Sequence, residues 1–414
     1  MKIKWISLML PVFTSAMWTA EGSYDSIDRH ALKAPYYAEQ KVESLAGYLI
    51  KPARNDRDKI RAIFRWITAN ISYDTQAYFI GKPQNHGSGD ILRDRTAVCD
   101  GFSTLIEMLG KEAGLNIVKI NGHAKGYDYR IGDHFSGPSN HAWNAVWIDG
   151  RWELLDATWG AGYIDESGEF IREFNDHFFC TDPEDMIFTH FPDNPRWQLL
   201  ATPVSQREFE SLPYLKPAYF RYRLKIKSHK KGEIISDGRL ELILENPENA
   251  ALIARLMKDS RYLGDHYSLV QNRNMETSIR VSFPEKGIYT LRLFARDRNE
   301  EGLYTWSMDY RIRVKSGQDA SAGFPEIFRS YKSHQAVLNR PLSGRLRKNT
   351  QVSFDITIPD AIEASVIQGD QWISLEKHQD RFTGIITVKQ GELRIGARFS
   401  QKPNFDILLK YRVE

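Results

Sequence analysis

The chain has 414 residues, of which 42% are hydrophobic and 26% are charged, as is usual for a globular protein of about two to four domains. Its formal net charge is only +3, because 56 basic residues are balanced by 53 acidic ones. This balance argues against a dedicated nucleic-acid-binding protein, so we expect no nucleic-acid partner. The densest basic stretch, residues 225–231, is predicted to form the solvated face and loop of a hairpin.

The N-terminus has the layout of a secretory signal peptide. Residues 1–4 supply positive charge, residues 5–13 are apolar, and small residues follow, with Ala16 and Ala20 as candidate cleavage points. A short buried helix is the alternative to a signal peptide. The apolar stretch is too short to span a bilayer in the mature protein. We therefore expect residues 1–20 to be removed and the mature protein to be secreted or periplasmic, without a membrane span.

Only two cysteines, Cys99 and Cys180, occur in the chain. Exported domains often carry disulfides, and a Cys99–Cys180 bridge would silence either thiol as a nucleophile. No Cys-x-x-Cys pair is present, and structural zinc sites usually need four ligands that come from such pairs. We therefore expect no metal and no cofactor, and we expect Cys180 to be a buried residue of the core.

Two amphipathic helices are predicted in the first third of the chain. Apolar residues recur at helical spacing in residues 55–70, where Asn55 or Asp56 can cap the helix, and again in residues 100–113. Cys99 therefore lies at or just before a helix start. Unpaired amide groups at such a place carry partial positive charge, which stabilises an anion, and the thiolate is the reactive form of cysteine.

A hairpin is predicted downstream of this helix. Residues 149–150, Asp-Gly, separate the apolar runs 141–148 and 151–159, and Asp-Gly between two such runs is a strong signal for a two-residue turn. In that register Ile148 faces Arg151.

Extending this register along the two strands brings a histidine and a carboxylate together. Trp143 is predicted to face Asp156, and His141 is predicted to face Thr158. His141 and Asp156 are then diagonal neighbours on one sheet face, with alpha carbons about 7–8 Å apart, a gap that the two side chains can close.

After about residue 215, short alternating strands replace helical periodicity. The predicted strands are 221–227, 239–244, 287–295, 351–358, 382–388 and 407–413. This spacing is typical of β-sandwiches, and the small, polar residues 315–324 are the best linker between two of them. We predict a first domain over residues 21–218, a β-sandwich over 219–316 and a second one over 317–414.

Cys99, His141 and Asp156 together have the composition of a thiol acyl-transfer site. The sulfur attacks a carbonyl carbon, the imidazole moves the proton, and the carboxylate orients the ring. Each residue also has a simpler interpretation: a cysteine at a helix start is more often a small buried residue, His141 can be an ordinary strand residue, and Asp156 can cap a turn. The conjunction favours the chemistry.

The sequence resembles the transglutaminase-like superfamily, and in particular its kyphoscoliosis-peptidase branch. The stretches that carry the resemblance are 63–74 (IFRWITANISYD), 97–102 (AVCDGF), 141–146 (HAWNAV), 152–160 (WELLDATWG) and 190–200 (HFPDNPRWQLL). By position, Cys99 matches the family nucleophile, His141 its general base and acid, and Asp156 its orienting carboxylate.

The resemblance implies an α+β, papain-related core, here followed by two immunoglobulin-like sandwiches. It implies a cysteine peptidase that acts on a protein or peptide, with the sandwiches as a possible contact to a cell-surface or envelope partner. A protein-crosslinking transglutaminase and a non-catalytic adhesion or scaffold module are the alternatives. Asp100 replaces the tryptophan that commonly follows the nucleophile in animal crosslinking enzymes, which lowers the first alternative.

Overall fold

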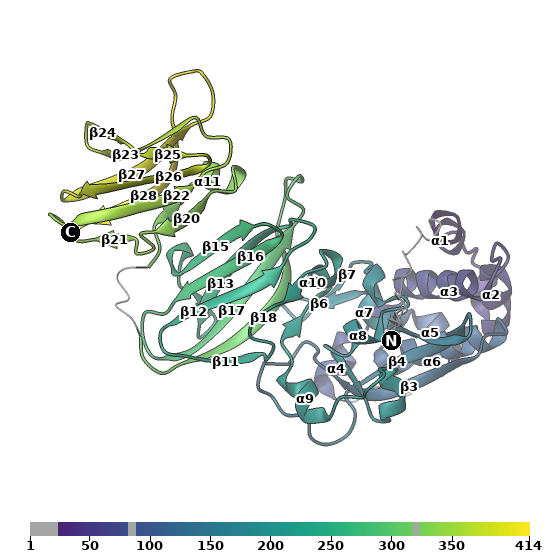
Figure 1. The fold of residues 1–414 in the computed structure, drawn as a ribbon. Helices are drawn as coiled ribbons and strands as arrows, with labels where there is room; N and C mark the ends of the chain where they lie inside the picture. Colours follow the sequence, from purple (N-terminus) through teal and green to yellow (C-terminus); the bar gives the residue numbers. More distant parts are fainter. Residues whose placement is uncertain (1–23, 82–87, 318–322) are drawn as a thin grey trace, which may run out of the picture.

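The computed structural model describes residues 24–81, 88–317 and 323–414. They form an N-terminal domain of helices and strands followed by two β-sandwiches, and Figure 1 shows these parts in chain order from one end of the molecule to the other. The predicted fold class is confirmed. The predicted signal peptide, residues 1–20, lies outside the described residues. Among the described helices, none is long and apolar enough to cross a bilayer.

The N-terminal domain packs its helices against one four-stranded antiparallel sheet. Its helices are α1 (Asp25–Ala31), α2 (Val42–Leu49), α3 (Asp56–Asn70), α4 (Thr75–Ile80), α5 (Ser88–Asp94), α6 (Cys99–Glu112), α7 (Ala157–Ala161), α8 (Pro183–Met186), α9 (Gln206–Ser211) and α10 (Pro217–Arg221). Its strands are β1 (Ser72–Tyr73), β2 (Thr96–Ala97), β3 (Ile117–Ala124), β4 (His141–Ile148), β5 (Arg151–Leu155), β6 (Gly162–Ile164), β7 (Phe170–Arg172), β8 (His190–Pro192) and β9 (Tyr214–Leu215). The sheet has the order β5-β4-β3-β8.

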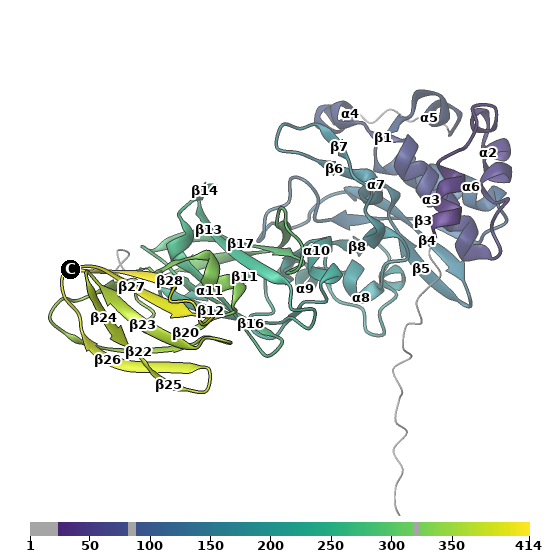
Figure 2. The same ribbon diagram turned by 90° about the horizontal axis from the view of Figure 1, so that it is seen from above.

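The two helices predicted from periodicity are confirmed as α3 and α6. Asn55 caps α3 by accepting a 2.8 Å hydrogen bond from the backbone N–H of Asp58. The apolar faces of both helices lie in the core, with Phe64, Trp66 and Phe102 among its fully buried side chains. Helix α6 packs on β3 and β4, as Figure 2 shows from above, so the residue that begins it lies beside the sheet.

Within residues 224–317 and 323–414, the two sandwiches consist of strands, one short helix and one 3-10 turn. The first is built from β10 (Lys225–Ile226), β11 (Glu233–Ser236), β12 (Arg239–Glu245), β13 (Ala251–Lys258), β14 (Arg261–Tyr262), β15 (Ser268–Arg273), β16 (Glu276–Ser282), β17 (Gly287–Arg296) and β18 (Thr305–Val314). Its sheets have the orders β10-β12-β16-β15 and β11-β18-β17-β13-β14.

The second sandwich repeats this two-sheet architecture. It comprises β19 (Glu326–Ile327), α11 (Arg329–Ser333), β20 (Val337–Arg340), β21 (Arg345–Leu346), β22 (Gln351–Thr357), β23 (Glu363–Gln368), β24 (Gln371–Ser374), β25 (Glu376–His378), β26 (Arg381–Thr387), β27 (Gly391–Arg398) and β28 (Asp406–Val413). Its sheets have the orders β19-β28-β27-β23-β24 and β20-β22-β26-β25. Alternate residues of these strands fill a separate apolar core.

One predicted strand starts too early. Residues 221–227 were expected to be extended, but Pro217 begins helix α10, which ends at Arg221, and β10 starts only at Lys225. Proline is favoured at the first position of a helix because its ring fixes a helical backbone angle and the missing N–H has no partner there.

The N-terminal domain and the first sandwich are joined by direct bonds. Strand β9 pairs with β18, with Leu215 opposite Met308. The buried ammonium of Lys125, directly after β3, donates to the backbone oxygens of Phe209 (2.8 Å) and Leu212 (3.1 Å) near the end of α9. Helix α9 leads into β9, so the Lys125 bonds hold β9 near the sheet that carries β4, and β9 in turn pairs with the sandwich. We call these contacts together the Lys125 junction.

Candidate active site

Cys99 is the first residue of helix α6, as the sequence predicts. The backbone N–H groups at such a start have no acceptor within the helix. Gly101 allows the strand before the helix to approach closely, because a Cβ at this position would lie 2.7 Å from the Cβ of Ala97. The Ser103 hydroxyl donates to the Cys99 carbonyl at 2.9 Å. The thiol thus sits on a short, tightly packed first turn.

His141 begins strand β4, directly opposite this turn. The Cys99 thiol lies close enough to the ring to help raise the pKa of His141. On the same strand, buried Asn144 donates from Nδ2 to the carbonyl of Ser103 at 3.0 Å and to that of Val118 at 3.3 Å. Asn144 therefore ties α6 to the sheet one turn away from the thiol, which sets the distance between sulfur and imidazole.

The hairpin after His141 has the predicted turn. Residues 149–150 form it, and Ile148 pairs with Arg151. The ladder ends at Leu155, three residues before Thr158, the last residue that the predicted register pairs.

The continuation of the predicted register is wrong, yet the two side chains still meet. Trp143 is not paired with Asp156 in the ladder, and His141 is not paired with Thr158, because Asp156 leaves the strand and caps helix α7. Its Oδ1 accepts from the backbone N–H groups of Thr158 (2.8 Å) and Trp159 (3.2 Å). Its Oδ2 lies 2.8 Å from Nε2 of His141. This bond leaves Nδ1 of His141 for the thiol.

His190 is a site residue to which the sequence analysis assigned no role. It comes from β8, and its Nε2 lies 3.1 Å from Oδ2 of Asp156. A hydrogen bond to a carboxylate requires a proton on Nε2, so Nδ1 of a neutral ring accepts from the Thr189 hydroxyl at 2.9 Å. Asp156 thus has four hydrogen-bond donors, and both imidazoles and the carboxylate are buried.

The protonation states of this cluster follow from burial and from the pairings. Burial opposes charge on His141, but the carboxylate of Asp156 more than offsets it and raises the pKa of His141 to about 10. Burial raises the pKa of Asp156, but the two imidazoles outweigh this effect and hold its pKa below the usual range. Burial lowers the pKa of His190 to about 4. At neutral pH, His141 is therefore cationic, Asp156 is anionic and His190 is neutral.

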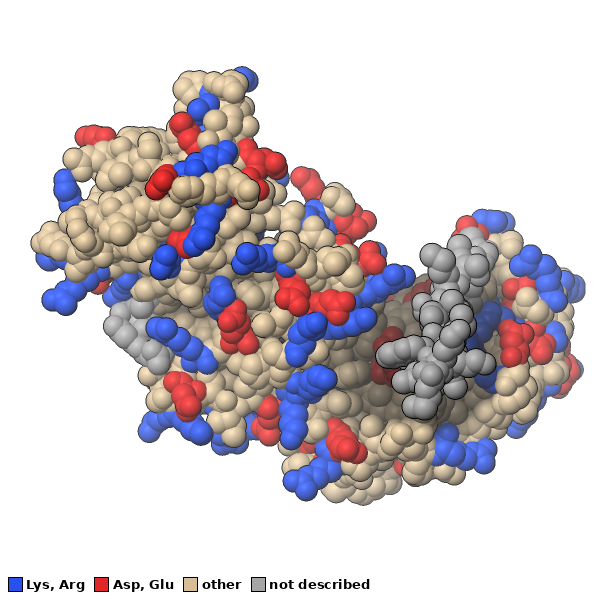
Figure 3. Space-filling view, in the orientation of Figure 1, with Lys and Arg blue, Asp and Glu red and all other residues tan. Residues whose placement is uncertain are grey.

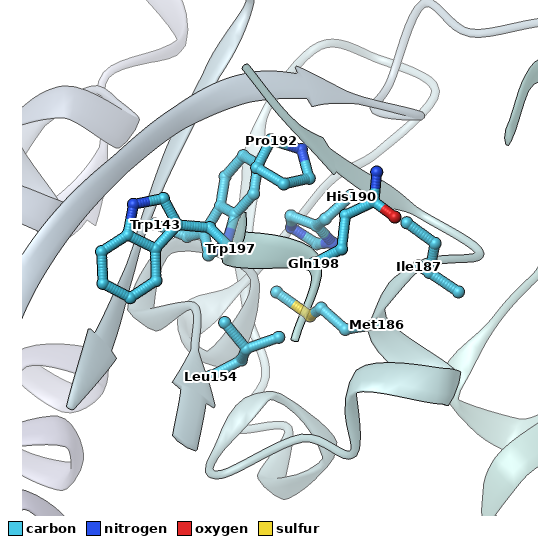
Figure 4. Close-up of a pocket in the computed structure, with 8 residues that line it drawn as sticks. All are labelled: Trp143, Leu154, Met186, Ile187, His190, Pro192, Trp197 and Gln198. Carbon is cyan, nitrogen blue, oxygen red and sulfur yellow. The ribbon is translucent and has the colours of Figure 1, made fainter. Parts of the chain in front are cut away.

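Aromatic side chains close the site behind the carboxylate. The Trp159 ring lies 4.5 Å from His190 and 5.5 Å from His141, between centroids. Figure 4 shows His190 among Trp143, Met186 and Trp197 around a cavity of about 10 Å³. A space of this size holds at most about one water molecule, so it is a gap in the packing behind the site and no substrate pocket.

The same cluster has the donor atoms of a metal site. His141, Asp156 and His190 each offer one ligand atom, and these atoms lie within 4.8 Å of one another. Two imidazoles and a carboxylate are ligands that zinc accepts. Here they are engaged with one another, so a metal would have to displace the shared protons.

The predicted alternatives for the cysteines can be compared with their surroundings. Cys99 and Cys180 are both free thiols, so the bridge between them is not formed. Cys180 is half-buried and packs against the core of the N-terminal domain, at a positive φ of 52°. Only Cys99 lies beside an imidazole of the cluster.

The charges on the surface are mixed. Figure 3 shows Lys and Arg side chains interspersed with Asp and Glu over the visible face of the two sandwiches and the N-terminal domain.

The comparisons with known proteins agree with this architecture. Residues 43–157 match the model of the transglutaminase-like superfamily, and residues 206–325 match a KY-like, immunoglobulin-like domain. The chain is 30% identical over 388 residues to the kyphoscoliosis peptidase of Mus musculus, an alignment that covers 90% of this chain and 57% of the relative. The chain therefore contains a transglutaminase-like domain, and its similarity to a kyphoscoliosis peptidase supports that branch of the superfamily.

Two further relatives of this transglutaminase-like chain cover smaller parts of it. Hillarin of Drosophila melanogaster is 28% identical over 231 residues, which is 53% of this chain and 28% of hillarin. A solved structure titled "Crystal structure of a TGase" is 20% identical, with a TM-score of 0.23, over 38% of this chain and 37% of that chain. The chain thus spans little more than half the length of its curated kyphoscoliosis-peptidase relative.

Proposed function

We propose that this transglutaminase-like chain is a cysteine-peptidase-like enzyme that hydrolyses a peptide or isopeptide bond through a thioester on Cys99. The observation that carries the proposal is that His141, hydrogen-bonded to Asp156 at 2.8 Å, lies beside the Cys99 thiol at the start of a helix. The thiol begins a helix, and an imidazolium lies next to it. Both features stabilise a thiolate and so activate the nucleophile.

The first half of the proposed reaction forms the thioester. The Cys99 thiolate attacks the carbonyl carbon, and the oxyanion that develops lies near the free N–H groups at the start of α6. The imidazolium of His141 then gives its proton to the leaving nitrogen, the C–N bond breaks, and an amine departs. Asp156 keeps the ring oriented and stabilises its cationic form, while His190 holds the second side of the carboxylate.

The second half releases the acid. Neutral His141 now takes a proton from water, the hydroxide oxygen attacks the thioester carbon, and the C–S bond breaks. The products are a carboxylic acid, which loses its proton to the solvent, and the thiolate paired once more with the His141 cation.

Acyl transfer to an amine is a second candidate, favoured by the match of residues 43–157 to the transglutaminase-like model. A primary amine in place of water would resolve the same thioester and leave a new amide. The two reactions differ only in which nucleophile reaches the thioester carbon.

A single experiment separates the candidates. Wild-type protein, Cys99→Ala and the matched control Cys180→Ala are incubated with a cell-envelope protein extract and a biotinylated primary amine. New peptide N-termini and biotin incorporation are then counted by mass spectrometry. New termini that depend on Cys99 support the peptidase, and biotin incorporation that depends on Cys99 supports the transferase. If neither signal depends on Cys99, the chain is a non-catalytic module and the proposal fails.

Export and partner binding are further parts of the proposal. The charged, apolar and small residues of the predicted signal peptide support secretion or a periplasmic location. The sandwiches are suited to hold a protein partner, by analogy with other immunoglobulin-like modules. Edman sequencing of the mature protein tests the first point, since an intact Met1 would contradict it.

A further inference from the structure

A row of four aromatic rings leads from the neighbourhood of Cys99 to the protein surface. The ring centroids of Tyr73 and Tyr78 are 5.9 Å apart, those of Tyr78 and Phe79 are 5.2 Å apart, and those of Phe79 and Tyr127 are 5.8 Å apart. All three contacts are edge-to-face, the arrangement that aromatic pairs prefer. We call Tyr73, Tyr78, Phe79 and Tyr127 the aromatic row.

The inner end of the row lies beside the thiol. Strand β1 pairs with β2, which puts Tyr73 opposite Ala97, two residues before Cys99. The Tyr73 ring also contacts Phe102, one turn into α6, with 6.4 Å between centroids. Burial raises the pKa of Tyr73, and the nearby Cys99 adds to this rise, in agreement with that position. The row thus begins where an acyl group on Cys99 would lie.

The outer end of the row is exposed. Phe79 is 53% exposed and Tyr127 is 39% exposed, and Ile80 beside them is 61% exposed. An apolar patch of this kind, continuous with a candidate active site, marks a surface that a ligand can cover. Helix α4 supplies Tyr78, Phe79 and Ile80. Figure 2 shows α4 near β1 and the β6–β7 hairpin at one end of the domain.

The row is held rigidly in spite of its exposure. The Asp74 side chain caps α4 by accepting from the N–H of Ala77 at 2.8 Å. The Tyr78 hydroxyl donates to Asp128 at 2.6 Å, which ties α4 to the loop that carries Tyr127. A surface fixed in this way loses little conformational entropy when it binds a ligand.

We propose that the aromatic row binds a large apolar side chain of the polypeptide whose carbonyl carbon reacts with Cys99. This inference rests on the proposed function and adds a substrate class to it. Side chains on the same side of an extended peptide are about 7 Å apart, close to the spacing of the rings, so an extended substrate can place an apolar side chain against the row. An acidic side chain at that position would lose hydration against the faces of aromatic rings, which repel an anion.

The test uses N-acetyl tripeptide acyloxymethyl ketones, in which a thiolate displaces the carboxylate and leaves a thioether. Phe or Asp is placed one, two or three residues from the ketone, with Ala elsewhere, and the rate of Cys99 labelling is measured by intact mass. At one of the three positions, we expect the Phe reagent to label Cys99 about tenfold faster than the Asp reagent does, because an apolar pocket discriminates to this degree. Phe79→Ser and Tyr127→Ser should each reduce that preference to about threefold or less.

The matched control is Tyr36→Ser, since Tyr36 is 79% exposed and does not belong to the row. It should keep the full preference. Equal rates for Phe and Asp at all three positions, or a preference that both row variants retain, would overturn the inference alone. Labelling by iodoacetamide monitors the thiol itself: if Cys99 reacts with it no faster than a free peptide thiol, the proposed function fails, and the inference fails with it.

Discussion

Two buried carboxylates, Asp156 in the N-terminal domain and Asp309 in the first sandwich, have different kinds of partner. Asp309 accepts from Nε of Arg292 at 3.0 Å and from Nη2 of the same guanidinium at 2.9 Å, and Trp306 donates to it at 2.8 Å. Burial raises the pKa of Asp309 even against this pairing, whereas two imidazoles hold that of Asp156 low.

The difference lies in what the partners can do with a proton. A guanidinium keeps its charge at every accessible pH, so the Arg292–Asp309 pair is a fixed element of the sandwich. An imidazole can give up its proton and take it back, and His141 also lies beside a thiol. A buried carboxylate is therefore no sign of a reactive site by itself, and the chemistry of its partners is the informative feature.

The largest expected effect is on the carboxylate of the reactive cluster. Asp156→Asn keeps the shape but presents an amide to His141, so the imidazole loses its orientation and the stabilisation of its cation. We expect turnover in the amide-cleavage assay to fall by about 10⁴-fold, with the fold retained. Turnover within tenfold of the wild-type value would show that Asp156 serves only to cap α7.

The corresponding change in the sandwich should affect stability instead. Asp309→Asn leaves the half-buried Arg292 guanidinium without its anionic, bidentate acceptor, which costs about 3 kcal/mol, at the low end for a buried ion pair. We expect a lower urea midpoint and an unchanged turnover per folded molecule. A large loss of turnover at full stability would remove the contrast between the two carboxylates.

The neutral partner of Asp156 should appear in the pH dependence of stability. The pKa of His190 is about 4 in the folded state against an ordinary 6.5, so the unfolded chain binds more protons between these values and stability falls as the pH drops through that window. At about 1.4 kcal/mol per pKa unit, the loss from pH 7 to pH 4.5 is about 2–3 kcal/mol. His190→Gln, which can keep both hydrogen bonds, should lessen the fall by this amount in urea titrations. Parallel pH curves for both proteins would contradict it.

The smallest expected effect is at the bond between helix and sheet. Asn144→Ala removes the hydrogen bonds to Ser103 and Val118 and should lower the free energy of unfolding by about 1–2 kcal/mol. Cys99 labelling should slow because the sulfur is less well placed against His141. Asn121→Ala, at an exposed position of the neighbouring strand, is the control. If both variants behave alike, Asn144 does not position the thiol.

The parts of the molecule that were predictable are those set by local pattern. Helical periodicity placed Cys99 at the start of α6, and the Asp-Gly turn placed His141 on the strand beside it. The predicted contact between Asp156 and His141 is present, but part of the reason given for it was wrong. Asp156 caps helix α7 and does not continue the ladder. The catalytic roles of these three residues stay predictions.

The parts that were not predictable depend on contacts between distant segments. His190 reaches Asp156 only because the three-residue strand β8 pairs with β3, and so short a strand leaves no periodic signal. Likewise, Tyr73 lies beside the thiol through the two-residue pairing of β1 with β2. Such contacts have their origin in tertiary packing, which local propensities do not encode.

The Lys125 junction restricts how a protein bound to the first sandwich could approach Cys99. Since it holds the first sandwich against the sheet that carries His141, this sandwich is not a flexible tether. A protein held by it would present its chain to Cys99 from one direction and at one distance. The bond that reacts would then be selected by its position along the bound partner. A flexible insertion after β9 should allow bonds at more positions to react.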